Sequence, residues 1–159
     1  MKKITLIMIA AWLMVFGFGI NSMAQIQDGE IEYFQSVYGM DKKLMVSEFL
    51  QINPTDPFWT IYDEYEVKRK DLGQTRFDLL NRYVENYDKL GDADYDEIVR
   101  QMIALRKNTD KLIEDYYKKV KKSNGSKVAA QFFQLEEYFI SEIRAGIMEG
   151  IPYIGEFDK

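Results

Sequence analysis

The side chains of this sequence with the most chemical potential are carboxylates. The stretch DADYDE places carboxylates at Asp92, Asp94 and Asp96, a spacing like that at the start of a calcium-binding loop. Such a loop needs glycine at its sixth position and a bidentate glutamate at its twelfth. Those positions hold Glu97 and Ile103. The sequence therefore predicts no calcium site there, and instead indicates acidic residues at the start of a helix.

Paired carboxylates are a second candidate, because two of them can cleave a glycosidic bond. Glu136 and Glu137 are adjacent, so they point in different directions on a helix, and we expect both at the rim of an apolar face. The chain has no histidine and no cysteine, which removes the usual general base and the thiol nucleophile. We therefore expect a protein that is not an enzyme and that needs no metal or cofactor.

The N-terminus has the pattern of a secretory signal peptide. Two lysines follow Met1, the run Ile4–Ile20 is apolar and uncharged, and the small residues Ser22 and Ala24 follow. The pattern predicts a signal peptide at residues 1–24 and an exported, periplasmic protein. The alternative is an uncleaved membrane anchor, because the run is close to the length of a spanning helix.

After cleavage, residues 25–159 form a chain of a length typical of one domain. Loss of Lys2 and Lys3 takes the formal charge from −5 to −7. An acidic chain is a poor ligand for nucleic acid, whose phosphates need a basic face. We expect a single helical domain with a flexible start at about 25–40, no integral membrane span and no nucleic-acid partner.

The apolar spacing predicts an all-α protein of four helices, the second and third forming a long antiparallel hairpin. The first helix is expected at about 41–50. The second is expected to begin at Asn53–Pro54 or Asp56–Pro57 and to run to Leu90, about 33 residues and roughly 50 Å. The third is expected to begin with Asp94 as its cap and Glu97 three residues later. Gly125 is expected to end it in a left-handed conformation, and a fourth helix with a broad apolar face then reaches Pro152.

Two arginines interrupt the apolar stripe of the second helix. Arg69 and Arg76 fall where the spacing of Tyr65, Leu72 and Leu79 predicts apolar residues. A long arginine can lie along an apolar surface and keep its charge in water. A mixed apolar and basic partner-binding surface is the other interpretation, and it would contain Tyr65, Arg69, Leu72 and Arg76.

Three aromatic-rich segments resemble a known family. They are FWTIYDEYE at Phe58–Glu66, LLNRYVENY at Leu79–Tyr87 and KVAAQFFQLEEYFISEIRAGIMEGIPYI at Lys127–Ile154. In this order they are similar to a family of exported helical proteins without a defined biochemical activity. That family is in turn distantly similar to the periplasmic proteins Spy and CpxP. The resemblance implies a Spy-like helical hairpin that forms a cradle-like dimer, and it implies no catalytic residues.

The resemblance also suggests the kind of function. Spy is an ATP-independent chaperone, and CpxP restrains a sensor kinase of the envelope stress response. We therefore expect a non-enzymatic envelope protein that binds unfolded clients or a regulatory partner on an apolar and basic helical surface. The alternatives are a signalling accessory that binds one sensor or anti-sigma partner, and a structural homodimer.

Overall fold

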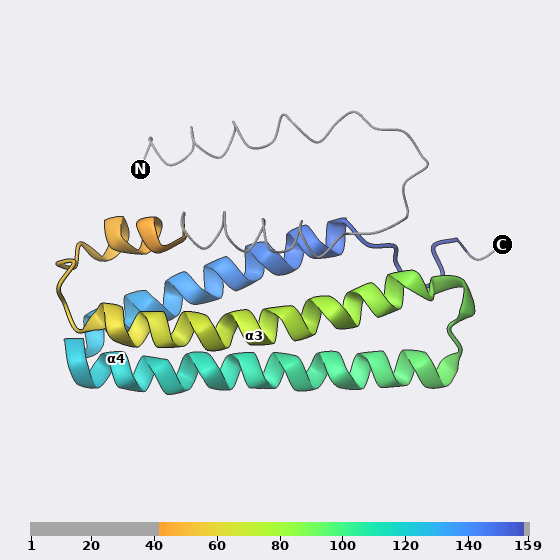
Figure 1. Ribbon diagram of the computed structural model, residues 1–159, viewed down its shortest axis with the longest axis horizontal. Coiled ribbons are helices and arrows are strands. Elements are labelled where there is room, and N and C mark those ends of the chain that lie inside the picture. The colour runs from red at the N-terminus through yellow and green to blue at the C-terminus, as the bar shows by residue number, and fades with distance from the viewer. Residues whose placement is uncertain (1–41, 158–159) are drawn as a thin grey trace, which may run out of the picture.

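The computed structural model describes residues 42–157, and every regular element in that part of the chain is helical (Figure 1). The elements are a helix at residues 42–50, α3 (Phe58–Glu85), the short 3₁₀ helix η2 (Tyr87–Lys89) and α4 (Asp92–Glu149). The predicted all-α class is therefore confirmed for the described residues. The predicted signal peptide at 1–24 and the flexible start at 25–40 lie outside them.

Within residues 42–157, no helix combines the length and the apolar character that crossing a membrane requires.

Gly125 divides α4 into two arms. Its φ of 84° and ψ of 171° are not helical, and this combination is essentially restricted to glycine. The chain turns there, so residues 92–124 form a first arm and residues 126–149 a second arm. The predicted break at this glycine is confirmed, although its ψ is extended and not left-handed helical.

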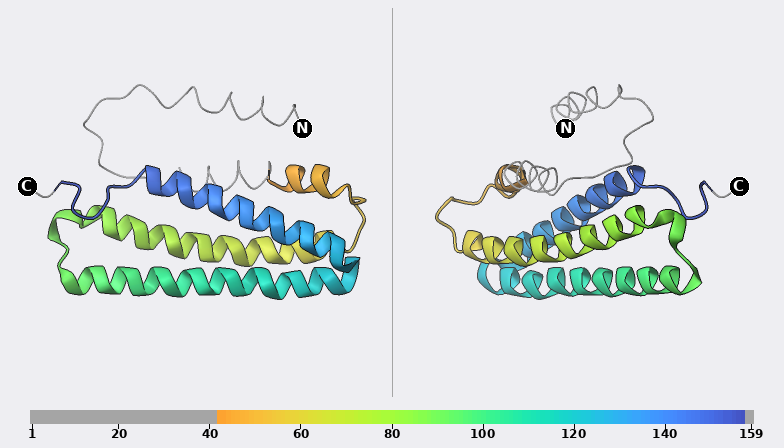
Figure 2. Two further views of the ribbon diagram at one scale, coloured as in Figure 1. Left: turned by 180° about the vertical axis from the view of Figure 1, so that it is seen from behind. Right: turned by 45° about the vertical axis from the view of Figure 1, so that its right-hand side comes forward.

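The first arm is antiparallel to α3 and the second arm is parallel to it (Figure 1). Arg82 bonds Gln101 near one end of the pair, and Glu64 bonds Lys119 near the other. Arg82 and Glu64 are 18 residues apart along α3, and their partners Gln101 and Lys119 are 18 residues apart along α4 in the opposite direction. Figure 2 shows the second arm close to the first arm at Gly125 and farther from it towards its own C-terminal end.

The start of α3 is set by Asp56. Its carboxylate accepts a hydrogen bond of 2.8 Å from the backbone N–H of Phe58, so it satisfies one of the free donors at the helix N-terminus. The same carboxylate accepts a bond of 2.7 Å from the side-chain amide of Asn124. The second of the two predicted starts, Asp56–Pro57, is the one adopted, and it ties α3 to the break in α4.

Two predicted helix boundaries are wrong. α3 ends at Glu85 and not at Leu90, because the side-chain amide of Asn86 bonds the carbonyl of Arg82 and the chain then turns through η2. The cap of α4 is Gly91 and not Asp94. The carboxylate of Asp94 lies in the first turn and accepts the N–H of Gly91 at 2.9 Å.

The core is rich in aromatic side chains and lies where helix 42–50, α3 and both arms of α4 meet. The ring of Phe132 lies edge-on to Tyr65, with centroids 5.2 Å apart, a favourable arrangement for aromatic pairs. The largest fully buried apolar residues are Phe58, Tyr62, Tyr65, Tyr116, Phe132, Ile113, Val46 and Val120. The apolar stripe predicted for the second arm thus faces the core through Phe132.

Replacing Phe132 by alanine is expected to lower the free energy of unfolding by about 3–5 kcal/mol, because it removes a buried ring and leaves a cavity. Urea denaturation measures the change. The matched control is Phe133→Ala at the neighbouring, exposed position, where a loss below about 1 kcal/mol is expected. Equal losses at the two positions would contradict the assignment of the core face.

Replacing Gly125 by alanine is expected to cost about 1–3 kcal/mol, because a Cβ is strained at this φ and ψ. No atom lies within 4 Å of the added Cβ, so the cost comes from the backbone alone. Gly73 in the middle of α3 is equally open, and Gly73→Ala is expected to gain about 0.5–1 kcal/mol. A lower melting temperature for Gly125→Ala together with a higher one for Gly73→Ala would support the break at Gly125. A higher melting temperature for both variants would argue against it.

Candidate functional site

Charged side chains meet in the core between helix 42–50, α3 and the second arm. Lys42 Nζ lies 2.6 Å from Glu66 Oε1 and 2.7 Å from Glu136 Oε2. The side chain of Lys42 is 3% exposed and that of Glu136 is 0% exposed. Charges so deeply buried are costly unless they are paired. One ammonium group therefore joins three helical segments.

Two further residues complete this arrangement. The hydroxyl of Tyr65 donates to Glu136 Oε2 at 2.7 Å. Arg69 donates through Nε and Nη2 to the two carboxylate oxygens of Glu66, each at 2.9 Å, which is the strong bidentate geometry of a guanidinium with a carboxylate. We refer to Lys42, Tyr65, Glu66, Arg69 and Glu136 as the ionic cluster.

The two carboxylates of the ionic cluster differ electrostatically. Burial raises the pKa of Glu136, and the ammonium of Lys42 offsets this only in part. Glu136 Oε1 has no hydrogen-bond partner among the described residues. Burial also disfavours the charged form of Glu66, but Lys42 and Arg69 together outweigh it and lower the pKa of that carboxyl. The charge of Glu136 is thus the less well compensated of the two.

The ionic cluster joins helices, and only Glu66 and Arg69 are partly exposed, at 13% and 14% of their side chains. Glu136 is fully buried and Lys42 nearly so, and the faces of aromatic rings surround the ammonium, Phe139 at 5.2 Å from its centroid. Within residues 42–157, no three potential metal ligands stand close enough to share an ion. The arrangement therefore anchors helix 42–50 on α3 and the second arm.

The four residues of the predicted partner-binding surface lie in different surroundings. Tyr65 is completely buried, and Arg69 is mostly buried against Glu66, so both are engaged in the ionic cluster. Leu72 and Arg76 lie further along α3 and are half-buried. The structure thus brings the first two together in the core and leaves the last two partly accessible. A role of these residues in partner binding stays a prediction.

Arg76 lies level with a second arginine. Tyr65 reaches Glu136, and Tyr83 reaches the carbonyl of Pro152 at 2.8 Å, so α3 and the second arm run in register between these contacts. With this alignment, Arg76 of α3 and Arg144 of the second arm lie within one helical turn of each other along the helix axes. Burial, and after it the charge of Arg144, lower the pKa of Arg76.

Exposed apolar side chains lie on the facing sides of the two arms. Val99 and Tyr117 are eighteen residues apart, five turns of a helix, and so share one side of the first arm. The rings of Tyr117 and Phe133 lie 6.3 Å apart, which turns these two sides towards each other. We refer to the following residues as the open face: Val99, Ile103, Tyr117, Phe133, Arg144 and Met148.

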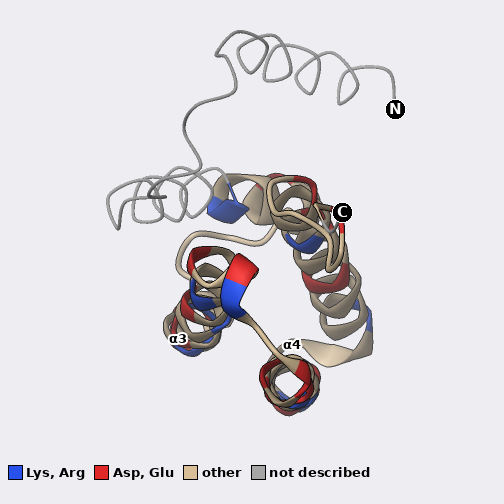
Figure 3. Ribbon diagram, turned by 90° about the vertical axis from the view of Figure 1, so that its right-hand side faces the viewer, with Lys and Arg blue, Asp and Glu red and all other residues tan. Residues whose placement is uncertain are grey.

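Figure 3 shows the second arm leading away from the first arm, and most apolar residues of the open face are exposed. Val99 is 49% exposed and Ile103 is 50% exposed, and Phe133 and Met148 are exposed too. On the first arm, Arg106, Asp110 and Glu114 lie on the same side between Ile103 and Tyr117, so the exposed apolar side chains form separate groups. Such groups are candidate places for contact with a partner. The open face is therefore one part of the described surface suited to hold an apolar ligand or segment, and helix 42–50, with Leu44, Met45 and Phe49 exposed, is another.

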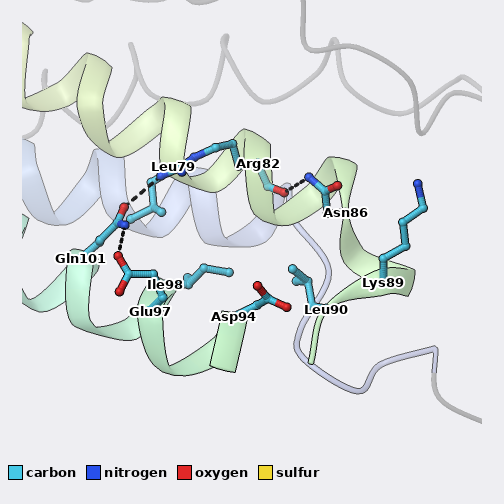
Figure 4. Close-up of a pocket in the computed structure, with 9 residues that line it drawn as sticks. All are labelled: Leu79, Arg82, Asn86, Lys89, Leu90, Asp94, Glu97, Ile98 and Gln101. Atoms are coloured by element: carbon cyan, nitrogen blue, oxygen red, sulfur yellow. Dashed lines mark hydrogen bonds between the residues drawn. The ribbon is translucent and has the colours of Figure 1, made fainter. Parts of the chain in front are cut away.

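A hollow of about 300 Å³ lies between the end of α3 and the start of α4, at the end of the molecule far from Gly125 and next to Val99 of the open face (Figure 4). Polar side chains there bond each other: Arg82 donates to Gln101 at 2.9 Å, and Gln101 donates to Glu97. The hollow is lined by Leu79, Arg82, Asn86, Lys89, Leu90, Asp94, Glu97, Ile98 and Gln101. These bonds join the two helices, so the hollow is less suited to a ligand than the open face.

Glu136 is the residue of the ionic cluster whose predicted position is wrong. We expected it at the rim of the apolar face, and it is in the core. It lies four residues after Phe132 and three before Phe139, in the middle of the buried stripe. This helical spacing indicates that Glu136 faces the core. Its partner Lys42 is 94 residues away, which no local pattern indicates.

In comparisons with protein-family models, with curated proteins and with solved structures, nothing matches this chain.

Replacing Lys42 by methionine is expected to lower the free energy of unfolding by about 3–5 kcal/mol, because it leaves the buried carboxyl of Glu136 without its cation. The double variant Lys42→Met/Glu136→Leu is expected to recover most of the loss, since neither charge then remains unpaired. Chemical denaturation of both variants measures the difference. A double variant as unstable as the single one would show that Lys42 acts through packing and not through charge.

The pH dependence of the Lys42→Met variant gives a second readout. A carboxyl with a raised folded-state pKa binds its proton more tightly when folded, so stability increases as the pH falls through that pKa. The variant should therefore regain stability relative to the native chain as the pH falls from neutral towards the ordinary range of a glutamate carboxyl. Glu66, whose pKa is lowered, loses its contribution only at lower pH and does not mask this gain.

Proposed function

We propose that this protein is a non-enzymatic binding protein of the cell envelope that holds unfolded clients or a regulatory partner on its open face. The observation that carries the proposal is the set of exposed apolar side chains on the facing sides of the two arms. Single exposed apolar residues are ordinary on protein surfaces, whereas several of them on the facing sides of two separating helices favour contact with a partner.

The mechanism is transient burial of apolar side chains of the client between the arms. Tyr117 and Met148 suit such a surface, because a tyrosine is large with a polar end and a methionine adapts its shape. Arg76 of the predicted partner-binding surface lies near Arg144 of the open face and supplies the basic element. Binding of this kind uses no nucleotide.

The resemblance to exported helical proteins is part of the proposal. We propose that the chain is exported to the periplasm and that its four helices form a Spy-like arrangement with a long hairpin. The pattern of a signal peptide at residues 1–24 supports the first statement. The antiparallel pairing of α3 with the first arm, joined by residues 86–91, supports the second.

Two experiments separate a chaperone from the alternatives. A signalling accessory for one sensor or anti-sigma protein should recover a single stoichiometric partner in a pull-down, whereas a chaperone recovers many clients. A structural dimer that uses up the open face should sediment as a dimer at all concentrations and bind no dye specific for exposed apolar surface.

The purified chain, residues 25–159, is expected to suppress the aggregation of a chemically denatured client at several-fold molar excess. The double variant Val99→Lys/Ile103→Lys should lose most of this suppression, because charge replaces the apolar side of the first arm. The matched control is Met45→Lys/Phe49→Lys on helix 42–50, also four residues apart and 42% and 48% exposed. Light scattering follows aggregation, and circular dichroism verifies that each variant folds.

Loss of suppression in the first variant only would support the open face. No suppression by the native chain would count against the chaperone function. Equal losses in both variants would mean that suppression is a general property of exposed apolar residues on this protein.

A further inference from the structure

Arg76 is the buried basic residue of α3 that the ionic cluster does not use. It lies eleven residues after Tyr65 and seven before Tyr83, about three and two helical turns, so it points to the same side of α3 as both tyrosines. That side faces the second arm, as the bonds of the two tyrosines to Glu136 and Pro152 show. Arg76 is half-buried, and its Nε has no hydrogen-bond partner within residues 42–157.

The surroundings of Arg76 differ from those of Arg69 two turns earlier. Arg69 is paired with both carboxylate oxygens of Glu66. After burial, the charge of another guanidinium, that of Arg144, lowers the pKa of Arg76. Arg144 is also half-buried and has no ion pair among the described residues. Two like charges in a partly desolvated place are costly, and an anion between them would remove the cost.

The chemistry of the two groups and of their neighbours selects the anion. Guanidinium groups bind planar oxyanions through paired N–H donors, and a carboxylate matches this geometry. Arg144 belongs to the open face, where Phe133 and Met148 share its side of the second arm. A ligand that contacts all of these must carry a carboxylate beside apolar groups, as an acidic and apolar peptide segment does.

We infer that Arg76 and Arg144 form a carboxylate-binding site at the inner edge of the open face, and that the segments held there carry an Asp or Glu next to apolar side chains. This inference rests on the proposed function and deepens it. The apolar residues of the open face provide contact area, and the arginine pair selects which segments bind.

The test uses two unstructured, fluorescently labelled peptides of the same apolar sequence, one with Glu and the other with Gln at a single position. The native chain should bind the Glu peptide about tenfold more tightly, since the lost contact is a charge-assisted hydrogen bond. The variant Arg76→Gln/Arg144→Gln should bind the two peptides equally. The matched control Lys70→Gln/Lys107→Gln removes the same charge at two exposed positions and should keep the preference.

A second measurement uses no peptide. Succinate, compared with chloride at equal ionic strength, should raise the melting temperature of the native chain and of the lysine control more than that of the arginine variant. In chloride the arginine variant should itself melt no lower than the native chain, because it loses a like-charge repulsion.

The outcomes separate this inference from the proposed function. Equal binding of both peptides by the native chain, with no specific effect of succinate, would overturn the carboxylate site and leave the open face intact. An effect of succinate that depends on the arginines, with no binding of either peptide, would support the anion site and count against the proposed function. A preference for Glu that persists in the arginine variant would place the carboxylate elsewhere and overturn the inference.

Discussion

A buried carboxylate constrains this structure more than any other group. Glu136 lies in the middle of an apolar stripe, where an ionised side chain is stable only with a cation brought to it. The cation is the ammonium of Lys42, whose Nζ lies 2.7 Å from Glu136 Oε2. Lys42 belongs to helix 42–50, so this pair holds that helix against the second arm. The pairing of Lys42 with Glu136 and the bond from Tyr65 to Glu136 compensate this charge, and they add to the apolar packing of Val46 and Phe132 that also joins the three segments. An apolar residue at this position would pack as well but would not require the helix to be there.

The second constraint is the backbone of Gly125. Without it the two arms of α4 would continue as one rod, and no surface of the first arm would face the second. The break brings the arms together near Tyr117 and Phe133 and lets them separate further on, so the apolar sides of the arms do not close on each other. The turn at Gly125 therefore produces both features. The core lies where the arms are close, and the open face lies where they are apart.

Much of the fold could be predicted from the sequence, because helical spacing is a local property. The start of α3 at Asp56–Pro57 and the break at Gly125 depend on residues next to each other. The cap of α4 was misplaced by three residues, since Asp94 can serve either as a cap or in the first turn. The position of Glu136 could not be predicted from polarity alone, because its burial depends on a lysine far away in the chain.

The separation of Lys42 and Glu136 along the chain also has a consequence for the order of folding. Arg82 and Gln101 are 19 residues apart, whereas Tyr65 and Glu136 are 71 apart and Lys42 and Glu136 are 94 apart. Closing a longer loop costs more entropy, so the hairpin of α3 and the first arm is favoured as the earliest structure. A ribosome synthesises Lys42 long before Glu136, and until then Lys42 can pair only with Glu66 of α3, 24 residues away. The most deeply buried ion pair of the molecule is thus among the last contacts that the growing chain can make.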